Sequence, residues 1–220
     1  MITSVIFDMD GLMFDTEALN ARGWHEAGAR HGFDITVEDL NPCVGVDLPT
    51  SCRLLTERFG EGFDYWAIRE ERIAWCFGWI EEHGVPEKPG LRELLSWLDG
   101  TDLKRAVATA SPRRMLDFYL SHLNLPLRFD ALVTCEEGMR GKPAPDLFLA
   151  AAKALDAKPE ECVVLEDSHN GIRAAHAAGM VPIMVPDRLP PTPEMESLFW
   201  RKADSLSAVI PLLDELKHNS

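Results

Sequence analysis

The sequence lacks a hydrophobic run of the length that a membrane-spanning helix needs. Such a helix takes roughly 20 consecutive apolar residues, and no stretch of this 220-residue chain approaches that length. The N-terminal apolar residues, Met1 to Phe7, have no basic region before them and run directly into acidic residues. This pattern does not resemble a secretion signal. We therefore expect a soluble, cytoplasmic protein that does not associate with membranes.

Cysteine and positive charge are also in short supply. The five cysteines are odd in number and widely spaced, and no two form a CxxC pair, so neither a disulfide framework nor a zinc site is expected. Only 22 Lys and Arg stand against 36 Asp and Glu, which gives a formal net charge of -14. A surface of this sign repels nucleic acid. A small anionic substrate stays compatible with it where a few cations gather at one site.

Internal repeats and low-complexity tracts are absent, and the apolar pattern instead divides the chain into two kinds of segment. Within residues 15–85, apolar residues recur at helical intervals. Outside this insertion, short apolar runs alternate with amphipathic stretches, which predicts a parallel sheet covered by helices on both faces. The predicted fold class is therefore α/β, with a core formed by residues 1–14 and 86–220 and an all-helical subdomain inserted at 15–85.

Polar residues follow the predicted strands where each one ends. In open parallel sheets, ligands collect at the carboxyl ends of the strands. The polar strand ends of this chain are Asp8 and Asp10, Thr109 to Ser111, Glu136 with Glu137, and Glu166 with Asp167. We therefore expect one functional site at this edge of the sheet.

The C-terminal region carries two proline signals. Residues 186–196 (PDRLPPTPEME) predict a surface connection without regular structure. Pro211 predicts a kink or a restart in a last helix that begins near Ser205.

Asp8 and Asp10 stand two residues apart at the end of the first apolar run. Because side chains alternate along an extended strand, both can reach one site while Met9 turns away. Gly11 then allows a sharp turn close to a ligand. One carboxylate can attack phosphorus, while the other donates a proton to the leaving oxygen and later takes one from water. A simple strand-ending turn is the alternative for this pair taken alone.

A second acidic pair, Glu166 and Asp167, follows another apolar strand and precedes a helix with Ser168 as its expected N-cap. Two acidic strand ends offer the oxygen ligands that Mg²⁺ prefers, and the ion would relieve the repulsion between the carboxylates. The alternative for the second pair is a stabilising position at a helix N-terminus.

Donors for an anionic substrate are expected around the same edge. Lys142 precedes a helix and would neutralise the nucleophile and a phosphate together. The Thr109 hydroxyl and the Ala110 amide would donate to phosphate oxygens, with Ser111 beside them. Arg113 begins the next helix and is a candidate for the far end of the substrate, with plain solvation as its alternative.

Four segments resemble, in order and spacing, the motifs of haloacid dehalogenase (HAD) superfamily hydrolases: DMDGLMFDTE, TAS, GKP and EDSHNGIRAAHAAGM. The resemblance covers essentially the whole chain. It is closest to the phosphatase and β-phosphoglucomutase-like subgroup, which has a helical C1 cap after the first motif. It implies a Rossmann-like core, with the insertion as the cap that sets substrate specificity.

The resemblance also implies a role for each motif residue. Asp8 would be the nucleophile, Asp10 the general acid and base, and Thr109 and Lys142 the groups that bind the phosphoryl group. Mg²⁺ is the implied cofactor, and its implied ligand set is Asp8, the Asp10 carbonyl and Asp167, with Glu166 as a neighbouring acid. Relatives that cleave carbon–halogen bonds or phosphonates lack the second aspartate, so Asp10 favours phosphate transfer.

The predicted activity is Mg²⁺-dependent hydrolysis of a small phosphomonoester, such as a sugar phosphate, through a phosphoaspartate. The expected partner is thus a small phosphorylated metabolite, bound by a monomer. Cap residues Glu17 and Asn20 and the loop Gly45 to Ser51 would contact the substrate. A phosphosugar mutase is the alternative, but mutases carry a cap His and Arg where this chain has Asn20 and Leu48.

Two other classes share parts of this pattern. A phospho-accepting receiver module also combines a strand-end Asp with Lys and Mg²⁺, but it needs neither the insertion nor Asp10. A DxD glycosyltransferase would not need the second acidic pair or Lys142.

Overall fold

The computed structural model describes residues 1–43, 48–123, 128–135 and 138–218. Its contacts divide the chain into two compact units. The core unit consists of Met1–Asp15 and Glu87–Ser220, and the helical unit consists of Thr16–Pro86. Among the described residues, no helix has both the length and the apolar character to cross a membrane.

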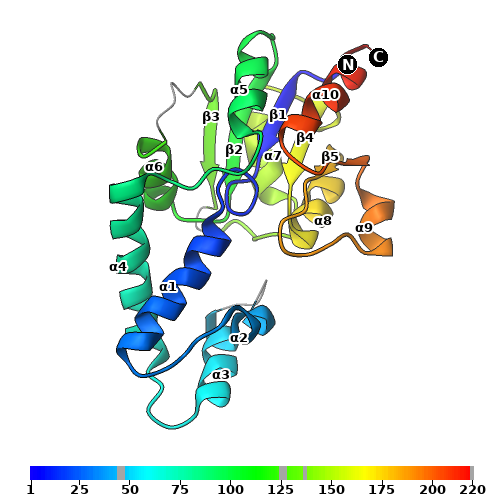
Figure 1. Cartoon of the computed structure of the whole chain (residues 1–220). Helices are drawn as coiled ribbons and strands as arrows, with labels where there is room; N and C mark the ends of the chain where they lie inside the picture. Colours follow the sequence, from blue (N-terminus) through cyan, green and yellow to red (C-terminus); the bar gives the residue numbers. More distant parts are fainter. Residues whose placement is uncertain (44–47, 124–127, 136–137, 219–220) are drawn as a thin grey trace. The chain divides into compact units, whose positions relative to one another are not determined.

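A six-stranded parallel sheet organises the core unit, in the order β3-β2-β1-β4-β5-β6 (Figure 1). The strands are β1 (Ser4–Phe7), β2 (Lys104–Thr109), β3 (Ala131–Thr134), β4 (Cys162–Glu166), β5 (Val181–Met184) and β6 (Arg201–Lys202). Phe7 pairs with Val107 on one side and with Leu165 on the other. The register therefore brings the residues after β1, β2 and β4 out at the same edge.

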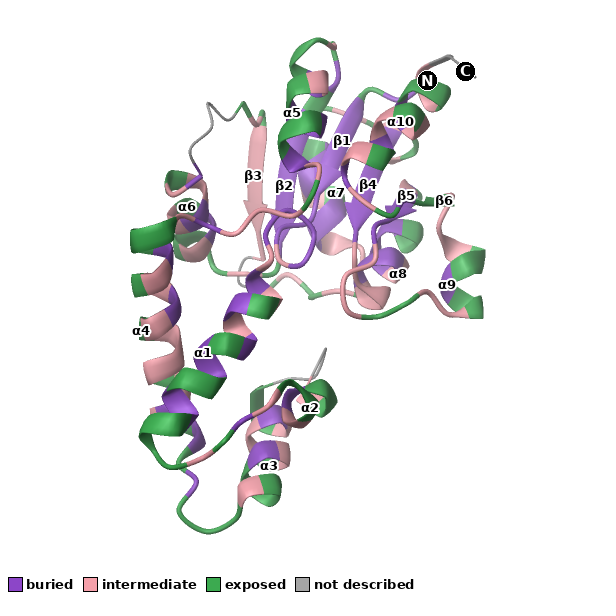
Figure 2. Ribbon diagram, in the orientation of Figure 1, coloured by how far each residue is buried: buried purple, intermediate pink, exposed green. Residues whose placement is uncertain are grey.

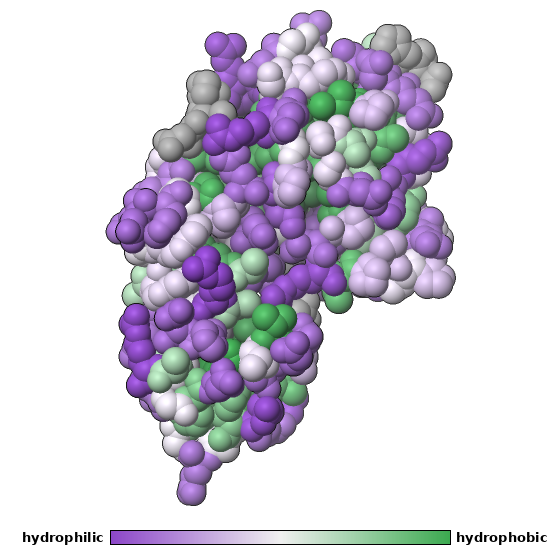
Figure 3. Space-filling model, viewed as in Figure 1, coloured by the Kyte–Doolittle hydropathy of each residue, from purple (hydrophilic) through white to green (hydrophobic). Residues whose placement is uncertain are grey.

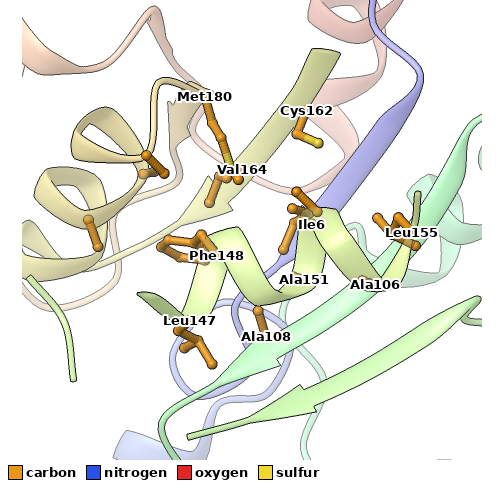
Figure 4. Close-up of a cluster of buried hydrophobic side chains, with 14 residues drawn as sticks. Ile6, Ala106, Ala108, Leu147, Phe148, Ala151, Leu155, Cys162, Val164 and Met180 are labelled. Atoms are coloured by element: carbon orange, nitrogen blue, oxygen red, sulfur yellow. The ribbon is translucent and has the colours of Figure 1, made fainter. Parts of the chain in front are cut away.

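Helices cover both faces of this sheet. The core helices are α5 (Leu91–Asp99), α6 (Arg113–Ser121), α7 (Asp146–Ala154), α8 (His169–Ala177), α9 (Pro193–Leu198) and α10 (Ile210–His218), with short 3₁₀ turns at Pro159–Glu161 and Ser207–Val209. Figure 4 shows Leu147, Phe148 and Ala151 of α7 against Ile6 and Val164 of the sheet.

The central strands are buried on their other face too, as the purple of β1, β2 and β4 in Figure 2 shows. Val5 and Phe7, which point away from Ile6, are fully buried. The predicted fold class, a parallel sheet with helices on both faces and an inserted helical subdomain, is confirmed. On the face seen in Figure 3, hydrophilic residues predominate, in keeping with the charged composition.

One C-terminal prediction is wrong. Residues 186–196 are not a connection without regular structure, because α9 begins at Pro193. Thr192 caps this helix by accepting a hydrogen bond from the Met195 N–H, and Pro193 occupies the first helical turn. Met195 is fully buried against Ile172 and Met184, so apolar packing holds the helix on the core.

The last helix restarts at proline, one of the two predicted outcomes. A 3₁₀ turn over Ser207–Val209 ends where α10 begins at Ile210, and Pro211 takes its second position. A proline has no N–H to leave unpaired in a first helical turn.

The helical unit comprises α1 (Thr16–Arg30), α2 (Val37–Leu40), α3 (Leu48–Phe59) and α4 (Tyr65–His83), with a 3₁₀ turn at Asn41–Cys43. The sequence pattern missed the short α2, whose signal is a capping box in which Thr36 and Asp39 exchange hydrogen bonds. An apolar cluster that includes Trp24, Ile35, Leu55, Tyr65 and Ile68 fills the interior of the unit.

Candidate active site

Three carboxylates converge at the edge of the sheet where β1 and β4 end. Asp8, Glu166 and Asp167 each offer an oxygen, and these oxygens all lie within 4.8 Å of one another. The Asp8 N–H donates to the Leu165 carbonyl at 3.1 Å, so the β1–β4 pairing continues into the site. A set of carboxylate oxygens at this spacing fits a hard divalent cation such as Mg²⁺.

Lys142 is the cation of this cluster. Its Nζ donates to Asp8 Oδ1, and to Glu166 Oε1 at 2.6 Å. The side chain is only 10% exposed and lies over the Phe148 ring, 4.9 Å from its centroid. Burial by itself lowers the pKa of Lys142, but the carboxylates of Asp8 and Glu166 outweigh burial and raise the pKa above its usual value. Lys142 therefore stays charged.

Glu166 is fully buried, and protein donors engage both of its oxygens. Oε1 accepts from Lys142, while Oε2 accepts from the Ser168 N–H at 2.7 Å and from the Ser168 hydroxyl at 2.9 Å. A Cβ at Gly171 would overlap this carboxyl group. Glu166 lies beside Asp8 and Asp167 in the carboxylate cluster, and its hydrogen bond with Lys142 also holds that lysine in place.

The carboxyl groups of Asp8 and Asp167 bind protons more tightly than exposed aspartates do. Burial raises the pKa of Asp8 to about 7, with Lys142 opposing the rise and Glu166 adding to it. Burial, followed by the charges of Glu166 and Asp8, raises the pKa of Asp167 to about 9. Several carboxyl groups thus share a poorly solvated space with one lysine. This imbalance is a physical reason for a divalent cation to bind there.

Asp10 lies just beyond Asp8, in a tight turn. Gly11 has a φ of 83°, and a Cβ there would lie 2.5 Å from Asp167 Oδ2, so both the turn and the close approach require glycine. Asp10 Oδ2 accepts a hydrogen bond from the Ser111 hydroxyl at 2.7 Å. Ser111 in turn donates its N–H to Thr109 Oγ1 at 3.0 Å. The loop after β2 therefore joins the loop after β1.

Two other predicted site residues of the core unit, Ala110 and Arg113, are exposed. Ala110 is exposed in the turn after β2. Arg113 is exposed and donates to Asp117 at 2.8 Å along its own helix. Glu17 and Asn20 belong to α1 of the helical unit, where Asn20 Oδ1 accepts from Arg72 at 2.5 Å.

Not all of the expected residues belong to the described part of the chain. Glu136 and Glu137 lie outside the described residues, and so does the first part of the loop Gly45 to Ser51, residues 45–47.

Sequence reasoning missed two contacts of this site, Ser111 with Asp10 and Gly171 with Glu166. The motif segments contain these residues, but the partners of the first pair stand 101 positions apart and lie in irregular turns. The contact of Gly171 with Glu166 could have been suspected from the sequence, because Gly171 stands in the first turn of a predicted helix. Glycine lowers helix stability there, so its presence suggests that a neighbouring group needs the space.

A sequence profile described as haloacid dehalogenase-like hydrolase matches residues 5–185. The chain belongs to this family. Hexitol phosphatase B of Escherichia coli (strain K12) is 36% identical to this haloacid dehalogenase-like hydrolase over 187 residues, which are 84% of each chain. The chloroplastic Protein SUPPRESSOR OF QUENCHING 1 of Arabidopsis thaliana is 35% identical over 185 residues, 81% of this chain and 17% of the plant protein.

Solved structures of the family share the fold. A HAD family hydrolase from Deinococcus radiodurans R1, crystallised with bound phosphate and sodium, superposes with a TM-score of 0.82 at 27% identity, covering 98% of this chain and 96% of the other. The β-phosphoglucomutase of Clostridium difficile superposes with a TM-score of 0.73 at 25% identity, covering 100% of this chain and 98% of the other. The chain thus falls among HAD phosphatases and mutases.

Proposed function

We propose that this protein is a Mg²⁺-dependent phosphatase that hydrolyses a small phosphomonoester through an aspartyl phosphate at Asp8. The observation that carries the proposal is the convergence of Asp8, Lys142 and Asp167 at the edge of the sheet, with Asp10 in the adjoining turn. A nucleophilic carboxylate, a fixed cation and a second carboxylate for proton transfer are the groups that this reaction requires.

The reaction takes place in two displacements. In the first, Asp8 forms a bond to phosphorus as the bond to the ester oxygen breaks, and Asp10 gives its proton to that departing oxygen. In the second, Asp10 accepts a proton from water while the water oxygen attacks phosphorus, which releases inorganic phosphate and restores Asp8.

The remaining residues of the site bind the phosphoryl group. Lys142, the Thr109 hydroxyl and the Ala110 N–H would donate hydrogen bonds to its oxygens. Asp8, the Asp10 carbonyl and Asp167 would hold Mg²⁺ with Glu166 alongside, and the ion would neutralise charge on the phosphoryl oxygens. Lys142 alone cannot balance three carboxylates and an incoming phosphate, since each like-charge pair about 4 Å apart costs on the order of 4 kcal/mol at an effective dielectric constant near 20.

We assign substrate choice to the helical unit. We also propose that the substrate is a sugar phosphate, because E. coli hexitol phosphatase B is named for a phosphorylated hexitol. Glu17 and Asn20 remain our candidates for contacts with the substrate, and Arg113 is a weaker one because it pairs with Asp117. An arginine has donors only, so the contact with Arg72 fixes the Asn20 carbonyl oxygen toward it. The Asn20 amide nitrogen then faces elsewhere and can donate to a hydroxyl oxygen.

The variant Asp8→Asn tests the mechanism because it keeps the shape of the side chain and removes the nucleophile. With Mg²⁺ and p-nitrophenyl phosphate, we expect turnover to fall by at least about 1,000-fold, the scale of a lost covalent catalyst. The exposed Asp102→Asn is the matched control and should act as the wild type. Near-normal activity of Asp8→Asn would reject the phosphoaspartate. A panel of sugar phosphates scored by kcat/KM would then identify the substrate.

The mutase alternative has the fold similarity in its favour and Asn20 against it. A mutase returns the phosphoryl group to a sugar hydroxyl, whereas a phosphatase gives it to water. Incubation with β-glucose 1-phosphate and a bisphosphate primer separates the two, and we expect inorganic phosphate rather than an isomerised sugar phosphate.

We further propose that the enzyme works in the cytoplasm as a monomer. All five cysteines are free in the structure, which suits a reducing compartment. Light scattering after size-exclusion chromatography would test the monomer.

A further inference from the structure

Ser111 connects two loops of the site. It lies two residues beyond β2, and its N–H donates to Thr109 Oγ1 at 3.0 Å, which ties the turn to the end of the strand. Its hydroxyl lies 2.7 Å from Asp10 Oδ2. The serine hydroxyl is the donor, and Oδ2 can accept from it both while Asp10 carries a proton on its other carboxyl oxygen and after that proton has left.

The Asp10 backbone is already fixed by its own turn. Asp10 forms a β-bridge with Phe14, and the Gly11 N–H donates to the Phe14 carbonyl at 2.9 Å. The carboxyl group can then change its direction only by rotation of the side chain. A hydrogen bond from a serine that is itself tied to a strand end opposes this rotation.

We infer that Ser111 is a positioning residue for proton transfer: its hydroxyl holds the Asp10 carboxyl in the orientation from which the proton reaches the leaving oxygen. The inference rests on the proposed function. As the Asp8–phosphorus bond forms and the ester bond breaks, the proton passes from Asp10 to the ester oxygen, while Ser111 keeps its own proton and donates the same hydrogen bond throughout. This role differs from the direct substrate contact that the sequence predicted for Ser111.

The two roles differ in how they depend on the leaving group. An alkoxide needs a proton as it departs, whereas nitrophenolate is a stable anion that leaves without one. Loss of a residue that orients the acid therefore slows alkyl esters and spares nitrophenyl esters. Loss of a residue that binds the phosphoryl group slows both equally, because the phosphoryl group is the same in both.

The experiment measures kcat/KM of wild type and Ser111→Ala on sorbitol 6-phosphate and on p-nitrophenyl phosphate, with Mg²⁺. We expect Ser111→Ala to lose about 10- to 100-fold on the alkyl ester, a part of what a general acid contributes, and less than about 3-fold on the nitrophenyl ester. Ser111→Thr keeps a hydroxyl and should recover most of the loss. Ser121→Ala, at an exposed serine whose hydroxyl bonds Phe118 within its own helix, is the control and should match the wild type on both.

An equal loss on both esters, or no loss on either, would overturn the inference, provided that circular dichroism and thermal melting show folded variants. If Ser111→Ala loses activity on the alkyl ester alone and Ser111→Thr does not recover it, that result would also contradict a positioning role for the hydroxyl. If the wild type hydrolyses neither ester, the proposed function fails and this role fails with it. Wild-type turnover with a uniform loss in Ser111→Ala refutes the positioning role alone.

Discussion

Gly171 illustrates how closely the site is packed. It lies in the first turn of α8, and its Cα abuts the carboxyl group of Glu166, the group that holds Lys142. Any side chain at this position would push Glu166 away from Ser168 and Lys142. The lack of a side chain at Gly171 therefore leaves room for Glu166, which positions Lys142, the lysine that we propose binds the phosphoryl group.

The variant Gly171→Ala should destabilise the fold although alanine is the better helix former. We expect the free energy of unfolding to fall by about 1–3 kcal/mol, the usual cost of overpacking, and turnover to fall with it as Lys142 moves. Gly78→Ala is the matched control, because Gly78 is an exposed glycine in α4 with open space around its Cα, and it should stabilise by up to about 1 kcal/mol. Urea denaturation of both variants checks the opposite signs.

The parallel strands explain why much of the molecule could be predicted from the sequence. Continuous apolar runs such as CVVLE indicate strands buried on both faces, and parallel neighbours end at a common edge. That reasoning places Asp8 near Asp167 without knowledge of any side-chain contact. It does not extend to the contact of Ser111 with Asp10, because that contact depends on rotamers in irregular turns that no periodicity encodes.

The α9 helix shows which secondary structure the sequence pattern did not predict. Its proline-rich sequence hides a helix of six residues, whose stability comes from the Thr192 cap and the burial of Met195 rather than from helix propensity. We expect Thr192→Ala to lower stability by about 1 kcal/mol, since it removes the hydrogen-bond acceptor of the Met195 N–H. Thr192→Ser retains that oxygen and should melt close to the wild type. Equal melting temperatures for all three proteins would show that the cap is not needed.

The charge imbalance at the site makes the stability of the protein depend on pH and on cations. Because burial raises both pKa values, the folded protein keeps a proton on Asp8 from about pH 4 to 7, and one on Asp167 from about pH 4 to 9, that the unfolded chain has released. Without a divalent cation, these groups make the free energy of unfolding decrease as pH rises through this window. The lowered pKa values of Asp39, Asp146 and Glu194 act in the opposite direction, but below the window.

Urea denaturation from pH 5 to pH 8, in EDTA and in Mg²⁺, tests this linkage. We expect stability in EDTA to fall with rising pH, and Mg²⁺ to stabilise more at pH 8 than at pH 5, because the cation competes with protons for the same oxygens. Asp167→Asn should flatten the curve in EDTA. A rise in stability with pH for the metal-free wild type would contradict the expectation.

The central position of β1 ties the assembly of the enzyme to the order of its synthesis. This strand is synthesised before both of its hydrogen-bonded neighbours, which begin only at Lys104 and Cys162. The backbone that leads into Asp8 must therefore wait for Lys104–Thr109 before its first edge is paired and for Cys162–Glu166 before its second edge is paired, and such long-range closure is slow. A nascent chain halted before Cys162 would carry three of the four motifs but would lack β4, Glu166 and Asp167, so the carboxylate cluster of the site could not form.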